Sequence, residues 1–300
     1  VPKGRNDTTR VVPFLLDETS KTKTTKMSMS FYVNQLKYIL SFELDKKRIY
    51  SETLTVYESI RPTKLYSRSY DPYTDSSVIE FGINLKMAKK NQDTIAGNTI
   101  NNCSVLAAFG NCNVGKTKLN DVYGYFAKQV KDVLAPGMLL SGYVKRHLDK
   151  DKDGNLKKFI LNFLKDSDFN IEDVTLHEEE ELITPELEQL IQKAPIADDA
   201  KSEMLKKGKI TNTELTFTHR TGNGLYELSE EYESNGTMRF LGMAIILNFL
   251  LKNNQFVPID EVETSIHYEL LSYFIKVFLA NSNQTSQMLL TTHDLSLIHI

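Results

Sequence analysis

The sequence is poor in cysteine, in long apolar runs and in excess charge of either sign. Its two cysteines, Cys103 and Cys112, have no metal-ligand spacing and cannot form a disulfide framework, which fits a reducing, cytoplasmic compartment. Lys and Arg total 36 against 39 Asp and Glu, so the net charge of -3 favours neither nucleic acid nor membrane binding. The longest apolar stretch, 240–251, is shorter than the roughly 20 residues that span a bilayer. With no signal peptide either, we expect no membrane partner.

The composition allows a folded core. A hydrophobic content of 41% and an aromatic content of 10% exclude a wholly disordered chain, and 300 residues predict one or two domains. We find no internal repeat. The ends are unusual, because the chain starts at Val1 instead of Met and stops at Ile300 within a His-Ile run.

Residues 25–85 have the pattern of an antiparallel β-region. Apolar and polar residues alternate over 27–33, as in a half-buried strand. Asn34-Gln35 then turns the chain into a second alternating strand over 36–44. The further strands that the sequence predicts are 49–57, 64–70 and 78–85.

Residues 100–225 predict a helical and insertion region. Apolar residues recur at helical spacing over 119–133, until Pro136-Gly137 ends the helix. The stretch 177–209 is charged, contains four successive glutamates and two prolines, and predicts exposed helices and loops. Shorter helices are expected at 143–147 and 156–164.

Residues 226–300 predict a βαβ unit preceded by a helix. The nearly all-apolar segment 238–251 indicates a helix that is buried on several sides. An apolar strand over 256–259, a helix over 265–279 and a second strand over 287–290 follow. Strands joined in this way are parallel, and ligands bind at the carboxyl ends of such strands.

The first of these strands delivers two adjacent carboxylates, Asp260 and Glu261, to its tip, as in a Walker B element. The first acid can hold Mg²⁺, and the second can polarise a water for attack on a phosphate. Taken alone, an Asp-Glu pair is more often an acidic turn, and Pro258 lacks a ladder N–H. His293 ends the next strand, where it could contact a γ-phosphate. The joint occurrence of the acids and the histidine favours a phosphate site.

Ser234, Asn235 and Gly236 stand before the buried helix. Ser234 is a suitable N-cap, and glycine lets backbone N–H groups approach a ligand closely. A helix N-terminus of this kind can bind an anion. An ordinary capped helix explains the same residues, and both interpretations stay open at this point.

Three segments resemble the signature, the Walker B with D-loop, and the His-switch of ABC-like AAA ATPases. This group includes bacterial abortive-infection and overcoming-lysogenization-defect proteins. In chain order the segments are ESNGTMR at 233–239, IDEVETSIH at 259–267 and LTTHD at 290–294. VPFLLD at 12–17 and FELDKKRI at 42–49 also resemble the early β-region of the family, while 140–225 resembles it least.

The resemblance implies an α/β fold of the P-loop NTPase class. This would be an ABC-ATPase-like head with a mixed sheet, an antiparallel β-region and a helical insertion. It also implies ATP and Mg²⁺ as cofactors, with Asp260 holding Mg²⁺, Glu261 acting as general base and His293 contacting the γ-phosphate.

The resemblance further implies a homodimer formed through the ATPase head. Ser234, Asn235 and Gly236 would complete the site of the opposing protomer, and Thr264 and Ser265 would lie in the D-loop. Asn235 departs from the ABC signature, which often has glycine there.

The function expected on this basis is ATP binding and hydrolysis coupled to dimer closure, in bacterial anti-phage defence and with an effector protein as partner. The alternative is a non-catalytic ATP-dependent clamp that binds nucleic acid or a protein partner. The near-neutral charge balance gives nucleic-acid binding no support.

One motif creates a conflict. GNCNVGKT at 110–117 matches the phosphate-loop pattern through Gly110, Gly115, Lys116 and Thr117. The residues alone predict Lys116 on the β/γ-phosphates and Thr117 on Mg²⁺. The resemblance instead makes 104–109 helical, which favours a chance match.

The resemblance also places the Walker A element before Val1. On that view residues 1–300 are a single ATPase domain truncated at both ends. Such a fragment would be inactive by itself without its phosphate loop.

Two other features carry no predicted function. The segment 149–154 copies the start of an EF-hand loop, but position 12 is Ile160 instead of the required acid, so we expect a solvated turn. His147, His177 and His219 have no partners at ligand spacing, and we assign them no role.

Overall fold

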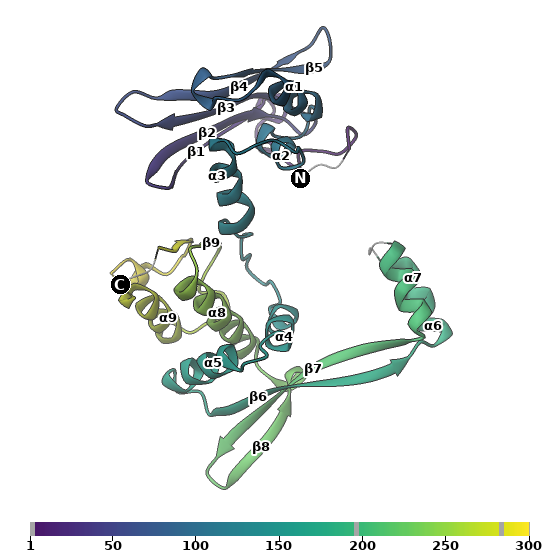
Figure 1. The fold of residues 1–300 in the computed structure, drawn as a ribbon. Helices are drawn as coiled ribbons and strands as arrows, with labels where there is room; N and C mark the ends of the chain where they lie inside the picture. The colour runs from purple at the N-terminus through teal and green to yellow at the C-terminus, as the bar shows by residue number, and fades with distance from the viewer. Residues whose placement is uncertain (1–3, 195–197, 282–284, 300) are drawn as a thin grey trace. The chain divides into compact units, whose positions relative to one another are not determined.

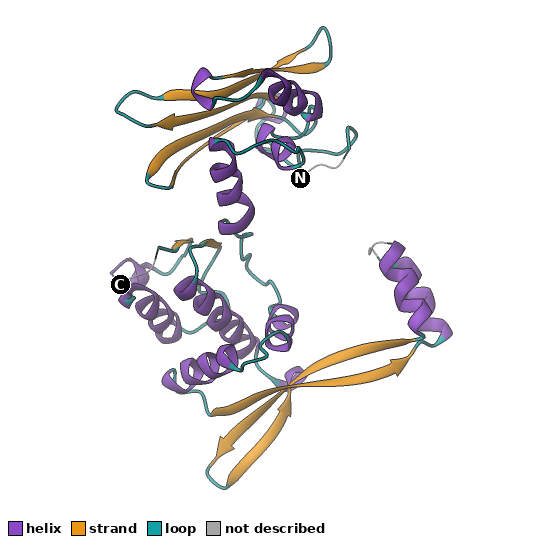
Figure 2. Cartoon of the chain, viewed as in Figure 1, coloured by secondary structure: helices purple, strands orange, loops and turns teal. Residues whose placement is uncertain are grey.

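The chain divides into two compact units, Val1–Val130 and Lys131–Ile300. A computed structural model describes residues 4–194, 198–281 and 285–299 (Figures 1 and 2). The boundary falls inside the helical and insertion region predicted over 100–225. Each unit has its own apolar core.

The first unit is built on a five-stranded antiparallel sheet in sequential order, which confirms the predicted β-region. Its first turn, Asn34-Gln35, has φ of 49° and 66°, the left-handed conformation that a tight two-residue hairpin requires. The last strand ends at Phe81, earlier than predicted, because Ile83–Leu85 form a 3-10 turn. The strands are β1 (Thr25–Val33), β2 (Leu36–Leu44), β3 (Ile49–Tyr57), β4 (Thr63–Asp71) and β5 (Ser76–Phe81).

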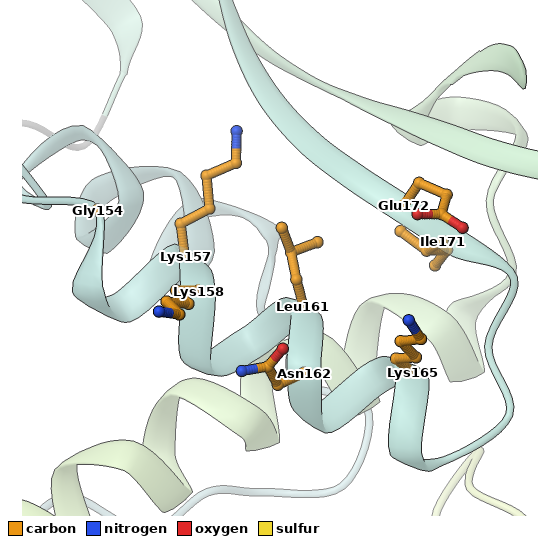
Figure 3. A pocket seen from close by; sticks show the side chains of 8 residues that line it. All are labelled: Gly154, Lys157, Lys158, Leu161, Asn162, Lys165, Ile171 and Glu172. Carbon is orange, nitrogen blue, oxygen red and sulfur yellow. The ribbon is translucent and has the colours of Figure 1, made fainter.

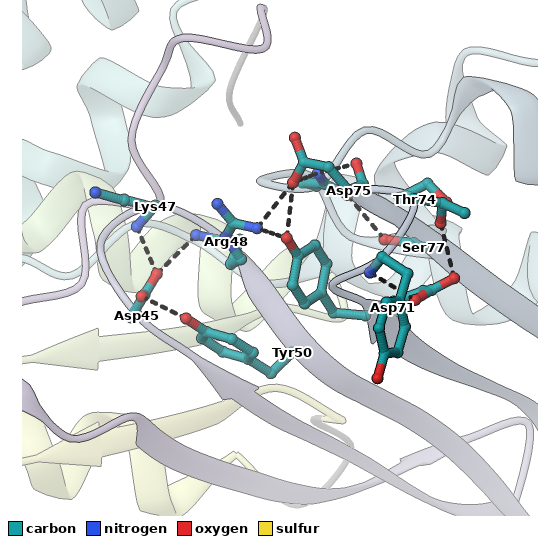
Figure 4. Close-up of polar contacts among 12 residues, drawn as sticks. Asp45, Lys47, Arg48, Tyr50, Asp71, Thr74, Asp75 and Ser77 are labelled. Carbon is teal, nitrogen blue, oxygen red and sulfur yellow. Dashed lines mark hydrogen bonds and ion pairs between the residues drawn. The ribbon is translucent and has the colours of Figure 1, made fainter.

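Polar contacts fix the turn between β2 and β3 (Figure 4). The Asp45 carboxylate accepts the backbone N–H groups of Lys47 and Arg48 at 2.7 and 2.8 Å. Arg48 donates to Asp75 Oδ1 at 2.9 Å and to the Tyr70 hydroxyl. The guanidinium thereby ties this turn to the turn between β4 and β5.

Short helices pack on the sheet through its apolar face. The helices are α1 (Lys89–Asn98), α2 (Val105–Gly110) and α3 (Lys118–Gly124), and a π-helical turn, Tyr125–Gln129, continues α3. The prediction of a helix over 119–133 is wrong beyond Gln129. The next residues leave the helix because Lys131 and Leu134 donate backbone hydrogen bonds to strand β9 (Phe256–Ile259).

A buried ion pair joins the sheet to this helical layer. The Arg68 and Glu52 side chains are fully buried, with Nη1 and Oε2 3.6 Å apart. Glu52 also accepts the Tyr66 hydroxyl at 2.6 Å and the Val105 N–H at 3.0 Å. Arg68 donates to three carbonyls within 100–103. The pair therefore anchors the start of α2 against β3 and β4.

The second unit surrounds one apolar helix, α8 (Asn235–Lys252), as predicted. Eleven of its residues are buried, and it packs against helices on several sides. Its neighbours are α4 (Ser141–Asp149), α5 (Asn155–Asp166) and α9 (Tyr268–Ala280), which confirm three further predicted helices. Within the described segments, no helix is both long and apolar enough to cross a membrane.

A long β-ribbon extends from this unit (Figure 1). It consists of β6 (Ile171–Leu182) and β7 (Lys209–Thr221), with α6 (Pro185–Lys193) and α7 (Asp198–Lys207) at its tip. The short strand β8 (Gly224–Ser229) pairs with the base of β7.

Helices α6 and α7 confirm the helices predicted within 177–209, but the ribbon corrects the prediction at 177–182, which form a strand. The four glutamates at 178–181 lie in β6, where their side chains are all exposed. A strand with both faces in water tolerates a charge run, and the Thr-rich β7 supplies its backbone partners.

The EF-hand-like turn proves to be a helix start. Asp151 accepts the backbone N–H groups of Leu156 and Lys157 at 3.1 and 2.8 Å. Its carboxylate therefore caps the first turn of α5, and residues 151–154 form the turn that the sequence predicted.

We predict that Arg68→Met lowers the free energy of unfolding by about 3–5 kcal/mol, because it leaves the Glu52 carboxylate buried without its cation. Chemical denaturation measures the loss. Lys89→Met, which removes an exposed pair with Asp93, is the control and should cost under about 1 kcal/mol. Equal effects of the two changes would show that the buried pair does not anchor the sheet.

Candidate functional site

Two parallel strands bring the predicted phosphate-site residues together. β9 pairs with β10 (Gln287–Leu290) in register, with Ile259 opposite Leu290. The residues that follow each strand therefore emerge at one edge. A backbone bridge from Leu134 to Ile259 adds a further parallel segment on the other side of β9.

Pro258 fits in β9 because of this arrangement. Alternate residues of a strand direct their backbone groups to opposite sides. The Pro258 carbonyl accepts the Leu134 N–H at 2.9 Å, so its missing N–H faces the short bridge and not the β10 ladder. The proline thus costs β9 no hydrogen bond with β10.

Thr291, the first residue after β10, connects the two strand ends. Its hydroxyl donates to Asp260 Oδ1 and accepts the Glu261 backbone N–H at 2.8 Å. Its carbonyl accepts the Val262 N–H at 3.1 Å, and its own N–H donates to Ile259 at 3.1 Å. One residue therefore fixes both the side chain of the first acid and the backbone of the second.

His293 lies beside the second acid. Its Nε2 is 3.7 Å from Glu261 Oε1, and both side chains face solvent, with exposures of 86% and 47%. The His293 backbone N–H donates to Glu263 Oε1 at 2.6 Å. Burial raises the pKa of Glu263, but this hydrogen bond and others outweigh it and hold that pKa below its usual value. Glu263 is therefore an anionic anchor for the histidine segment.

The backbone of Glu261 is unusual. Its φ of 44° lies in the left-handed region, which a glutamate seldom adopts. Residues held in such conformations cluster at functional sites, where the surrounding contacts maintain them. Here the Thr291 hydroxyl supplies such a contact.

The strand ends fit a magnesium ion. The Asp260 carboxylate and the Thr291 hydroxyl offer oxygen ligands, which Mg²⁺ prefers. Among residues 4–194, 198–281 and 285–299 no group of three metal-ligating side chains occurs. In protein sites Mg²⁺ takes one or two carboxylates and completes its shell with water and substrate phosphates.

The predicted signature residues lie at the start of α8. Ser234 caps this helix, since its Oγ accepts the Thr237 N–H at 2.9 Å. Gly236 abuts the predicted D-loop, because a Cβ there would lie 2.7 Å from the Ser265 carbonyl oxygen. In the described part of the chain, no hydrogen bond or ion pair joins Ser234, Asn235 or Gly236 to Asp260.

The phosphate-loop match lies in a different local structure. Helix α2, not a strand, leads into Gly110, and Thr117 caps α3 with a capping box. Four backbone amides of the loop already donate within the chain, those of Asn111, Cys112, Val114 and Thr117. A phosphate loop needs a preceding strand and available amides. The geometry thus gives the predicted roles of Lys116 and Thr117 no support. Residues 105–109 lie in α2 and Ser104 is its N-cap, so this segment is helical after its first residue, as the family resemblance implied.

A separate pocket of about 390 Å³ lies along α5 (Figure 3). Three lysines line it, and one of them, Lys157, pairs with Asp173 at 2.7 Å. The pocket shares no residue with the strand-end cluster. The lysines that line it are Lys157, Lys158 and Lys165.

Comparison with known proteins agrees with the motifs. Residues 106–299, well over half of the chain, match the family model described as "AAA domain, putative AbiEii toxin, Type IV TA system". The chain belongs to this AAA-domain family. The match confirms the predicted relationship to AAA-type ATPases of the abortive-infection kind. No curated protein matches the sequence.

Sequence reasoning missed two residues of this site. Thr291 lies within the His-switch segment and Glu263 within the Walker B segment, but the motifs predict no role for either residue. Thr291 could have been found from its position. It is a hydroxyl residue directly after a predicted strand, and the neighbouring strand ends in the acids Asp260 and Glu261. Glu263 gives no such signal, because its contact with His293 spans thirty positions.

We predict that Gly236→Ala lowers the free energy of unfolding by about 1–3 kcal/mol, because the new Cβ overlaps the Ser265 carbonyl. Thermal or chemical unfolding measures the change. Gly142→Ala in α4, where nothing lies within 4 Å of the added carbon, is the matched control and should not destabilise. If both variants were as stable as the parent, the contact between signature and D-loop would be refuted.

Proposed function

We propose that this chain forms the part of an ATPase that binds Mg²⁺-ATP at the carboxyl ends of β9 and β10 and hydrolyses it. The observation that carries the proposal is the Thr291 hydroxyl, which holds Asp260 and the Glu261 backbone while His293 lies beside Glu261. Membership of an AAA-domain family supports it.

Each residue has a separate task in this proposal. Asp260 and Thr291 would hold Mg²⁺, which supplies positive charge against the phosphates. Glu261 orients a water molecule and takes its proton as the water attacks the γ-phosphorus, so that ADP leaves and phosphate forms. His293 donates a hydrogen bond to a γ-phosphate oxygen from the side, and the Glu263 contact keeps it there.

A homodimer would complete the site. The start of α8 presents N–H groups and the positive end of its helix dipole, which favour a phosphate. Because Gly236 lies against the Ser265 carbonyl of the D-loop and Ser234 bonds to Thr237 instead of Asp260, we propose that both bind the γ-phosphate of the opposing protomer. The family description places such proteins among toxin–antitoxin systems, and we propose a role in anti-phage defence.

Glu261→Gln in the intact protein should lower kcat by at least about 10²-fold, because the amide cannot accept the proton of water. It should keep ATP bound, which a filter-binding assay measures beside phosphate release. Glu269→Gln, an exposed residue in the first turn of α9, is the control. Unchanged hydrolysis would refute Glu261 as the base. A parent protein that binds Mg²⁺-ATP without turnover would favour the clamp alternative.

Thr291→Val should weaken Mn²⁺ binding in the presence of ATP roughly ten- to hundred-fold, because Asp260 loses the hydroxyl that orients it. Electron paramagnetic resonance of free Mn²⁺ measures the affinity. Thr291→Ser retains the hydroxyl and should stay close to the parent. The same affinity in Thr291→Val as in the parent would remove Thr291 from the site.

A further inference from the structure

The residue directly before the signature serine has a buried acidic side chain. The Glu233 side chain is only 6% exposed, and its Oε1 forms an ion pair with His219 Nε2. Burying a carboxylate is unfavourable unless a hydrogen-bonded partner compensates the lost hydration. His219 is the partner that the structure gives it.

His219 belongs to the base of the β-ribbon. It lies near the end of β7, pairs in register with Ile171 of β6 and Tyr226 of β8, and is itself partly buried. Strands on both sides therefore hold this position of the sheet. The imidazole therefore offers the segment before α8 a partner that belongs to the sheet.

The contact between Glu233 and His219 can act on the signature segment because Glu233 directly precedes Ser234. Glu233 is extended, with φ of -75° and ψ of 151°, and its N–H donates to the Glu230 carbonyl at 3.2 Å. Ser234 follows at once and caps α8. With the Glu233 side chain held by β7, the Ser234 hydroxyl and the first N–H groups of α8 have a set direction.

We propose that His219 and Glu233 are a positioning pair that aligns the signature turn for the phosphate of the opposing protomer. This inference rests on the proposed ATPase function. Neither residue touches the nucleotide; each acts through the backbone that carries Ser234. Because His219 is placed by the pairing of β7 with β6 and β8, an active dimer would also require that these strands pair in this register.

The test uses the intact protein, as for Glu261→Gln, and compares ATP turnover with nucleotide binding. His219→Gln and Glu233→Gln should each lower kcat roughly ten- to hundred-fold, because small displacements of a positioning group cost that much. The affinity of the isolated site for a fluorescent ATP analogue should stay within about twofold, since Asp260 and Thr291 are intact. The double variant should be no slower than either single variant, because both remove one contact.

Arg220→Gln is the matched control. Arg220 is the next residue of β7, and its guanidinium pairs with Glu172 on the exposed side of the ribbon, not with the signature segment. It should leave kcat unchanged. Thermal melting followed by circular dichroism establishes that all variants are folded. Glu233→Gln is the substitution that changes the shape of the side chain least.

Parent-like kcat in both folded single variants would overturn the positioning pair while leaving the ATPase proposal intact. The same follows if Arg220→Gln lowers kcat equally, since the effect would then belong to the ribbon in general. Absence of ATP turnover and of nucleotide binding in the parent protein would overturn the proposed function, and this inference with it.

Discussion

One hydroxyl group, that of Thr291, is the interaction on which the candidate site depends. It donates to the Asp260 carboxylate and accepts the Glu261 N–H, so the tips of two strands behave as one rigid element. The parallel register of β9 and β10 makes this contact possible, because Ile259 and Leu290 end opposite each other. The positive φ of Glu261 is then a conformation that the neighbouring strand stabilises.

The second unit also connects these strand ends to the start of α8 and to the base of the β-ribbon. Gly236 lies against the D-loop carbonyl of Ser265, so the start of α8 is positioned by the segment that follows the acids. On its other side, Glu233 contacts His219 at the ribbon base. The signature turn is therefore held between the strand-end loop and the ribbon, and the phosphate contact that we propose for it would use this fixed position.

The sequence predicted β9 and β10 well, because each is a short apolar run that ends in polar residues and a helical pattern separates the two. The hairpin at Asn34-Gln35 and helix α8 follow equally from local chemistry. The prediction was wrong where tertiary pairing decides. β6 is a strand despite four successive glutamates, since β7 supplies its backbone partners, and the helix after α3 stops at Gln129 because the next residues pair with β9. The match at 110–117 shows that a sequence motif alone does not establish a phosphate loop. A helix leads into this segment, and several of its backbone amides already donate hydrogen bonds within the chain.

The central claim is that the carboxyl ends of β9 and β10 hold the nucleotide. A crystal structure of the intact protein with Mg²⁺ and a non-hydrolysable ATP analogue tests it most directly. We expect Mg²⁺ at about 2.1 Å from an Asp260 oxygen or one water away from it, with the γ-phosphate beside His293. Nucleotide bound at Gly115–Thr117 and remote from Asp260 would contradict the account.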